Sequence, residues 1–281
     1  CPLGGGALVA TGACHSTETG AAPRAEPSGR RATLFFTSEL LGQVEPCGCR
    51  SRPLGGVQRI ARIVDQPGAA WVDAGDFLLP PTLSPHEREQ HLLKARYLAR
   101  IFRMAGGIAL NLGPTDAQQG GDLLRDLQRD GALPLVSANI RPVGEVGPAV
   151  ARSFLRTVGE VKVGITGLAT PEAFSDLTGL AALEYAPIVE AEVKALREDG
   201  ADVVVVLAQL ERVHAVRFAR AVEAIDVLLH GSRPEDGWGE PSPAVQVNRT
   251  TLVDGGFKGR YVGSLRFALP PGEPSRPVRL R

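Results

Sequence analysis

Two cysteines separated by one glycine, Cys47-Gly48-Cys49, have the clearest chemical potential in this sequence. The glycine lets the backbone turn tightly enough for the thiols to close as a disulfide of very small loop, which is strained and more easily reduced than an ordinary bridge. Such a pair can be a redox couple, a soft-metal site for copper(I) or zinc, or a thiol attachment point. A static disulfide that fixes its loop is the structural alternative.

The spacing of this pair argues against several other cysteine sites. A c-type haem is attached through Cys-x-x-Cys-His, whereas here Arg50 follows the second cysteine. An iron–sulfur cluster needs about four thiolates, and thioredoxin-type motifs have a two-residue spacer. Arg50 and Arg52 would favour the thiolate form or receive an anionic ligand, although loop arginines are most often simply solvated.

The N-terminal segment resembles the start of a bacterial lipoprotein. Thr11-Gly12-Ala13-Cys14 is similar to a lipobox, and the segment that follows is polar and rich in Pro, Gly, Ser and Thr, as in a disordered tether. Either Cys14 is acylated, or the chain begins at an acylated Cys1, or the N-terminus is unmodified. Acylation predicts a membrane-anchored protein of the bacterial cell envelope that faces the periplasm or exterior, where disulfides form.

Composition predicts a single large α/β domain. The chain has 281 residues, of which 43% are apolar, enough for a sizeable core. Its 31 basic and 31 acidic residues give no net charge, which argues against a nucleic-acid partner and against electrostatic adsorption to a membrane. The expected organisation is a signal remnant or tether over residues 1–32, one domain over 33–269 and a flexible Pro-rich tail over 270–281.

A strand–helix–strand unit surrounds the cysteine pair. LFFT, residues 34–37, is typical of a buried strand, and WVDAGD, residues 71–76, of a second strand whose acidic end emerges at a loop. The helix between them is expected to bury one face, formed by Val57, Ile60, Ala61 and Val64.

Two further helices follow from apolar periodicity. The first is expected to end at Gly106-Gly107 and to expose His86 and His91. Its predicted buried face consists of Leu93, Tyr97, Ile101 and Phe102. The second opens near Pro187, and its predicted buried residues are Val189, Val193 and Leu196.

From Thr33 to Leu269 the sequence resembles the 5'-nucleotidase family. The matching blocks, in order, are TSELLGQVEP, LGGVQRIARIV, WVDAGD, ALNLGPTDAQQG, LVSANI, VGEVKVGITGLATPE, GADVVVVLAQL, IDVLLHGSRP and TLVDGGFKGRYVGSLRF. That family includes periplasmic UDP-sugar hydrolases and the thiosulfohydrolases of sulfur oxidation, on a calcineurin-like metallophosphatase fold. The resemblance implies an α/β protein, a four-layer α/β/β/α sandwich of two mixed sheets with helices outside.

The family binds two divalent metals through five loops, and the first two loops are partly preserved here. Its Asp-x-His motif corresponds to Glu39 and Leu41, so a carboxylate remains and the imidazole is lost. The aspartate that bridges both metals corresponds to Asp76, which is intact.

The other three loops have lost their ligands. The family's Gly-Asn-His-Glu, whose His protonates the leaving group, corresponds to Gly113 through Asp116. Its fourth-loop His corresponds to Gln209, and its Gly-His-x-His to Gly231 through Pro234, preceded by His230 at a strand end. A pair of divalent ions needs several carboxylates and imidazoles, and without metal no water is activated.

The resemblance therefore implies a degenerate, non-hydrolytic member of the family, without a cofactor, that acts in binding or through Cys47 and Cys49. One alternative is a divergent phosphoesterase with a single Mn, Fe or Zn ion held by a rebuilt site. Its candidate ligands are Glu39, Asp76, Asp116 and His230. The other alternative is a structural or assembly subunit with a protein partner that the sequence does not name.

Overall fold

The computed structural model describes residues 29–46, 53–131, 133–144, 147–177, 179–231 and 240–270. The predicted acylation sites Cys1 and Cys14 lie outside these residues, as do Cys47 through Arg52 with the cysteine pair and both arginines. Within the described part, no helix has the length and apolar character needed to cross a bilayer.

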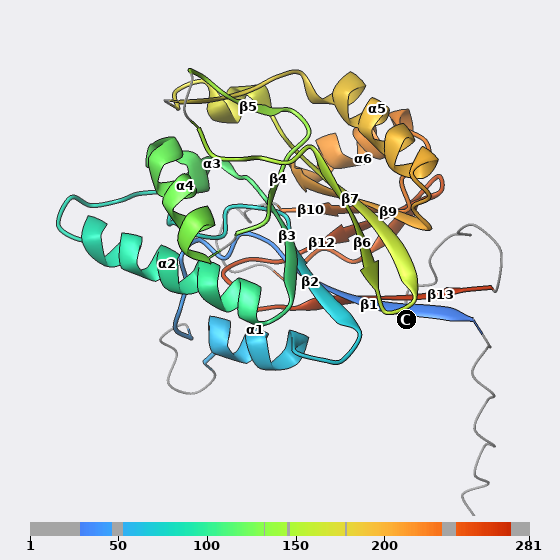
Figure 1. Cartoon of the computed structure of the whole chain (residues 1–281), viewed down its shortest axis with the longest axis horizontal. Coiled ribbons are helices and arrows are strands. Elements are labelled where there is room, and N and C mark those ends of the chain that lie inside the picture. Colours follow the sequence, from blue (N-terminus) through green and yellow to red (C-terminus); the bar gives the residue numbers. More distant parts are fainter. Residues whose placement is uncertain are drawn as a thin grey trace, which may run out of the picture.

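The first sheet has five strands in the order β13-β1-β2-β3-β4 (Figure 1). Four of them run parallel: β1 (Arg30–Thr37), β2 (Ala69–Asp73), β3 (Gly107–Asn111) and β4 (Leu135–Val136). The edge strand β13 (Gly263–Leu269) runs antiparallel to β1. A parallel sheet of this kind needs apolar cover on both faces, which explains the near-continuous apolar runs of its strands.

The second sheet has six strands in the order β11-β12-β10-β9-β7-β6. Its strands are β6 (Ser153–Val158), β7 (Val161–Ala169), β9 (Val203–Gln209), β10 (Val227–His230), β11 (Val245–Val247) and β12 (Thr250–Asp254). The four inner strands are parallel and the two edge strands are antiparallel to their neighbours. A separate small ladder pairs β5 (Ile140–Pro142) with β8 (Leu180–Ala182).

Helices cover the outer face of each sheet, which completes four layers (Figure 1). The first sheet is covered by α1 (Val57–Val64), α2 (Arg88–Met104) and α4 (Gly120–Gly131), and the second by α5 (Tyr185–Glu198) and α6 (Arg212–Ala221). Two short elements remain, α3 (Pro114–Ala117) and the 3₁₀ helix η1 (Pro171–Phe174). The predicted α/β/β/α sandwich of two mixed sheets is confirmed.

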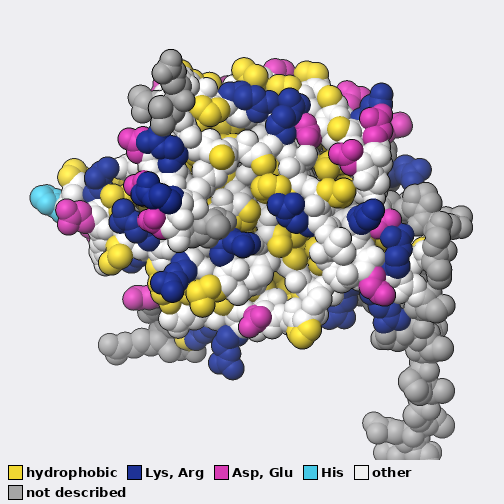
Figure 2. Space-filling view, in the orientation of Figure 1, with side chains coloured by type: hydrophobic (Ala, Val, Ile, Leu, Met, Phe, Trp, Pro, Cys, Tyr) yellow, Lys and Arg dark blue, Asp and Glu magenta, His cyan; other side chains and the backbone are white. Residues whose placement is uncertain are grey.

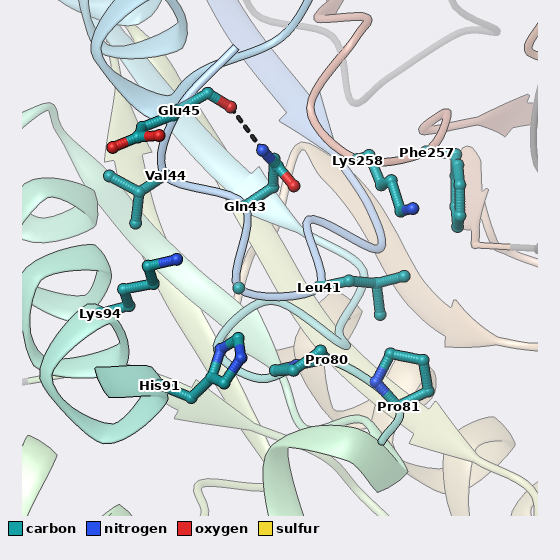
Figure 3. Close-up of a pocket in the computed structure, with 11 residues that line it drawn as sticks. Leu41, Gln43, Val44, Glu45, Pro80, Pro81, His91, Lys94, Phe257 and Lys258 are labelled. Atoms are coloured by element: carbon teal, nitrogen blue, oxygen red, sulfur yellow. Dashed lines mark hydrogen bonds between the residues drawn. The ribbon is translucent and has the colours of Figure 1, made fainter. Parts of the chain in front are cut away.

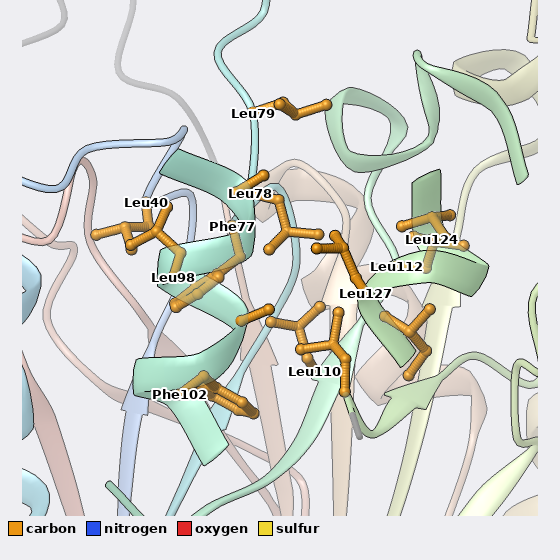
Figure 4. Close-up of a cluster of buried hydrophobic side chains, with 14 of the residues drawn as sticks. Leu40, Phe77, Leu78, Leu79, Leu98, Phe102, Leu110, Leu112, Leu124 and Leu127 are labelled. Carbon is orange, nitrogen blue, oxygen red and sulfur yellow. The ribbon is translucent and has the colours of Figure 1, made fainter. Parts of the chain in front are cut away.

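Each boundary between layers is a separate apolar cluster. Under α2, the rings of Trp71, Phe77 and Phe102 lie with their centroids 4.7 to 5.6 Å apart, among leucines that Figure 4 shows. Strand β9 divides its side chains by alternation: Val205 packs between the sheets, whereas Val206 packs beneath α5 and α6. A strand buried on both faces therefore joins the inner and outer cores.

The first strand begins at Arg30, three residues before the expected start of the domain. Residues 30–32 continue the antiparallel ladder with β13. The guanidinium of Arg30 also donates two hydrogen bonds to the carboxylate of Asp202, at 2.6 and 2.8 Å. This bidentate pair joins the start of β1 to the residue before β9.

The predicted buried face of α2 is wrong for two of its residues. Leu93 is 66% exposed and Tyr97 is 41% exposed, and Ile101 is only half-buried, while Phe102 is fully buried as expected. The face that packs on the sheet consists of Ala95, Leu98, Ala99 and Phe102. Its alanines let the helix approach the sheet closely, whereas a face of larger side chains would hold it away. The predicted faces of α1 and α5 are confirmed, except that Ala61 is half-buried.

Charged side chains of both signs are interspersed over the face visible in Figure 2. This distribution fits the equal numbers of basic and acidic residues in the sequence.

The buried carboxyl group of Asp73 joins the carboxyl ends of β1 and β2 through hydrogen bonds. The hydroxyl of Thr37 donates to Asp73 Oδ2 at 2.6 Å and accepts a hydrogen bond from the Trp71 indole at 2.9 Å. The amide of Gly75 donates to Asp73 Oδ1 at 2.8 Å. Burial raises the pKa of Asp73 to about 7 despite these two donors, and the nearby Asp76 adds to the increase.

This raised pKa makes stability depend on pH in a defined direction. Between about pH 4 and pH 7 the unfolded carboxyl is ionised while folded Asp73 keeps its proton, so the free energy of unfolding falls as pH rises. Asp73→Asn removes the titration. The stability of this variant relative to the wild type should therefore increase with pH, by up to about 1.4 kcal/mol per pH unit.

Urea denaturation at several pH values across this window measures the effect. Asp176→Asn, at an exposed position, is the matched control because it removes a carboxylate from the surface. A constant difference between Asp73→Asn and wild type across the window would contradict the raised pKa.

Candidate functional site

Loops at the carboxyl ends of both sheets meet at one place. The amide of Glu39, after β1, donates to the carbonyl of Gly75, after β2, at 2.9 Å. The carbonyl of Glu39 accepts the amide of Lys258, after β12, at 2.8 Å. A Cβ on Gly231, after β10, would lie 3.3 Å from Cγ of Glu39. The loops that the resemblance assigned to the metal centre are thus brought together.

Three residues of this region have left-handed backbone conformations that are uncommon outside glycine. The φ angles are 47° for Glu39, 53° for Leu41 and 56° for Asp76. The amide of Leu41 donates to the carbonyl of Asp76 at 2.8 Å, so a hydrogen bond joins the strained segment after β1 to the strained segment after β2. Strain of this kind is concentrated at functional sites.

Thr115 donates two hydrogen bonds to the carboxylate of Asp76. The backbone amide of Thr115 donates to Asp76 Oδ1 at 2.8 Å, and its hydroxyl donates to the same oxygen at 2.9 Å. Both residues are buried. Pro114, at the first position of the short helix α3, fixes the backbone that presents these donors. Thr115 stands at the position of the histidine that protonates the leaving group in the family. Its hydroxyl and its backbone amide are both hydrogen-bonded to Asp76.

Asp116 is a buried carboxyl that links two loops. Its Oδ1 accepts the amide of Leu78 at 2.7 Å, and its Oδ2 accepts the amide of Gly113 at 3.3 Å. Burial raises the pKa of Asp116 well above its usual range, and the charge of Asp76 adds to the increase.

Amide side chains join the strand ends of the two sheets. Gln209, at the position of the family's fourth-loop His, donates from Nε2 to the carbonyl of Ala74 at 3.1 Å. Asn111 donates from Nδ2 to the same carbonyl at 3.0 Å and to that of Leu168 at 2.9 Å. Neither the role of Asn111 nor the contact between Thr115 and Asp76 was predicted from the sequence. For Thr115, the feature of the sequence that could have indicated a structural role is its position directly after the proline that begins α3.

His230 is fully buried at the end of β10. By strand alternation it shares the face of Leu228, which packs under α6. Burial lowers the pKa of His230, with Asp254 acting against that effect and Arg212 in the same direction. Neither ring nitrogen has a hydrogen-bond partner among the described residues.

The described residues do not fit the metal centre that the fold implies. Within the described ranges, no three His, Cys, Asp or Glu side chains form a group that could hold a metal ion. One oxygen of Asp76 accepts two hydrogen bonds from Thr115. Gly231 is described, whereas Ser232, Arg233 and Pro234 lie outside the described residues.

Solved structures similar to this one include hydrolases. A 5'-nucleotidase precursor from Thermus thermophilus is 25% identical, with a TM-score of 0.69 over 84% of this chain and 51% of that one. The calcineurin-like phosphoesterase YfkN from Bacillus subtilis is 16% identical, with a TM-score of 0.70 over 89% and 88% of the two chains. The Thermus thermophilus sulfate thiohydrolase SoxB is 18% identical, with a TM-score of 0.65 over 87% and 54%.

The chain thus spans about half the length of the 5'-nucleotidase and SoxB structures. No family model matches the sequence, and no curated protein is significantly similar to it. The order of the two sheets, the position of the strand-end loops and these structural matches agree with one another. The described part of the chain has a metallophosphatase-like fold, similar to about half of the 5'-nucleotidase precursor structure and to most of the calcineurin-like phosphoesterase structure.

Proposed function

We propose that this domain is a non-hydrolytic member of its fold, which binds a ligand where its relatives hydrolyse theirs. The observation that carries the proposal is the pair of hydrogen bonds from Thr115 to Asp76 Oδ1, at 2.8 and 2.9 Å. In a two-metal hydrolase this carboxylate would bridge the ions. Here one of its oxygens is directed to protein donors.

The chemistry of the neighbouring positions supports the same proposal. Hydrolysis of a phosphate ester by this fold needs a metal to activate water and an acid to protonate the leaving group. Leu41, Pro114 and Thr115 stand at the corresponding ligand and acid positions and can do neither. The proposed domain therefore has no cofactor requirement.

A metal-dependent phosphoester hydrolase is the second candidate. It is favoured by the similarity to a 5'-nucleotidase precursor and to a calcineurin-like phosphoesterase. Glu39 and Asp76 are both buried at the meeting point of the loops, so two carboxylates remain where such an enzyme would need them.

We also propose that the domain is held at the bacterial cell envelope by a lipid anchor on Cys14 or Cys1, and faces the periplasm or exterior. The support is the lipobox-like Thr11-Gly12-Ala13-Cys14 and the polar segment after it. In that oxidising setting, Cys47 and Cys49 are proposed to form a reducible disulfide. The support is their one-residue spacing and the adjoining arginines.

Phosphoesterase assays test the non-hydrolytic assignment. With added manganese, turnover of p-nitrophenyl phosphate and its bis-ester by wild type should equal the metal-free blank, because loss of a general acid alone costs about 100-fold or more. Asp76→Asn should show the same blank rate. Asp254→Asn is the matched control, since it also alters a strand-end carboxylate that accepts backbone amides. Turnover above the blank that only Asp76→Asn abolishes would favour the hydrolase.

Detergent-phase partitioning tests the anchor. The protein expressed in bacteria with a full signal peptide should enter the detergent phase, because the several acyl chains of a lipoprotein bind membranes firmly. One of Cys1→Ser and Cys14→Ser should move it to the aqueous phase, whereas the control Cys47→Ser should not. Partitioning that is unchanged by both N-terminal substitutions would rule out the anchor.

Redox titration tests the cysteine pair. We expect Cys47 and Cys49 to be oxidised as isolated and reduced by a mild dithiol without unfolding, since structural bridges have potentials below about −300 mV and strained exposed ones lie higher. Once reduced, the thiols should be alkylated faster than a model thiol, as measured by mass spectrometry of the peptides. Reduction that requires denaturant, or that lowers the melting temperature steeply, would identify a structural bridge instead.

A further inference from the structure

A cavity of about 280 Å³ opens beside the strained loop after β1 (Figure 3). Four segments line it: the loop from Leu41 to Glu45, the prolines at 80 and 81, the α2 residues His91 and Lys94, and Phe257 with Lys258 after β12. Its size is near the lower end of the range of about 300–1,000 Å³ for ligand pockets. The cavity is therefore suited to a small molecule.

Two lysines give the cavity an excess of positive charge. Lys94 and Lys258 lie on opposite sides of the cavity, with the loop that carries Leu41 and Gln43 between them in Figure 3. Both are half-buried, and neither forms an ion pair within the part of the chain that the structure describes. The one acidic side chain among the described lining residues, Glu45, is exposed and contacts Gln43 through its backbone carbonyl.

Lys258 is held in position before any ligand arrives. Its φ angle is 53°, and its amide donates to the carbonyl of Glu39 at 2.8 Å. Its ammonium lies 5.2 Å from the centre of the Phe257 ring, within the range of a cation–π contact. A charge fixed in this way loses less conformational entropy when it binds an anion.

The remaining lining residues offer a further polar atom and an apolar wall. His91, predicted to be exposed, is half-buried, and its Nδ1 is buried with no hydrogen-bond partner among the described residues. Leu41, Val44 and Phe257 supply apolar contacts. Leu41 stands where the family has a metal-binding imidazole, so the same replacement that removes a ligand adds to this wall.

We propose that this cavity binds a small organic anion, whose carboxylate or phosphate pairs with Lys94 or with Lys258 and whose apolar part contacts the apolar side chains of the wall. This inference rests on the proposed function, because it gives the non-hydrolytic domain its ligand class. A half-buried cation beside an apolar wall selects a molecule that is charged at one end and apolar at the other.

Titrations followed by two-dimensional NMR test the assignment with three probes: phenyl phosphate, benzoate and the neutral benzyl alcohol. We expect the two anions to shift amides of Leu41 through Glu45 and of Lys258, and benzyl alcohol to bind at least about tenfold more weakly, because it lacks the charge-assisted hydrogen bonds. Tighter binding of phenyl phosphate would identify a phosphate ligand, and tighter binding of benzoate a carboxylate ligand.

Lys94→Gln or Lys258→Gln, whichever removes the paired cation, should weaken binding of the preferred anion by about tenfold or more. The matched control is Lys162→Gln, an exposed lysine on β7, which should leave the affinity unchanged. Thermal melts establish that each variant is folded. Equal binding of the neutral probe, wild-type affinity in both lysine variants, or no shifts at the cavity residues would overturn the assignment.

The same samples separate this inference from the proposed function. Phenol released from phenyl phosphate with manganese, and lost in Asp76→Asn, would overturn the non-hydrolytic assignment while lysine-dependent binding could still be present. Absence of both turnover and binding would rule out the anion site but would leave the non-hydrolytic assignment supported.

Discussion

Three buried carboxyl groups, Asp73, Asp76 and Asp116, lie at neighbouring strand ends, and their charge must be offset. Burial of an uncompensated carboxylate is costly, so such groups are either protonated or surrounded by hydrogen-bond donors. Both solutions are present. Burial raises the pKa of Asp73 and of Asp116, while Asp76 accepts two hydrogen bonds from Thr115. The loops around this edge are arranged by these donors.

The three carboxyl groups also connect the loops at this edge. The amides of Gly75, Leu78 and Gly113 each donate to one of these groups, so the β2 and β3 loops are tied together. The cores between the layers consist of strand residues such as Val205 and Val206. Site residues can therefore change while the layers persist, which is how one fold accommodates many functions.

The resemblance to the 5'-nucleotidase family was sufficient to predict the layers and the meeting of the loops. It placed Glu39, Asp76 and Gly231 in loops of one site, and the structure brings these loops together. The side on which His230 lies was not predictable, because Val227 through His230 is buried throughout and shows no alternation. The buried face of α2 was misread since two apolar stripes share its surface, and only the close approach permitted by Ala95 and Ala99 selects between them.

The cavity beside β1 could not be predicted for a different reason: its residues come from four segments that are far apart in the chain. The sequence has no net charge, which gives no sign of a local excess of positive charge. That excess arises only in the folded chain, where α2 contributes Lys94 and the loop after β12 contributes Lys258 to the same cavity. Leu41 belongs both to the strained loop after β1 and to the wall of this cavity. In the function proposed above, the apolar side chain at the position of the family's metal-binding imidazole contacts a ligand instead of a metal ion, so one residue type serves both parts of the proposal.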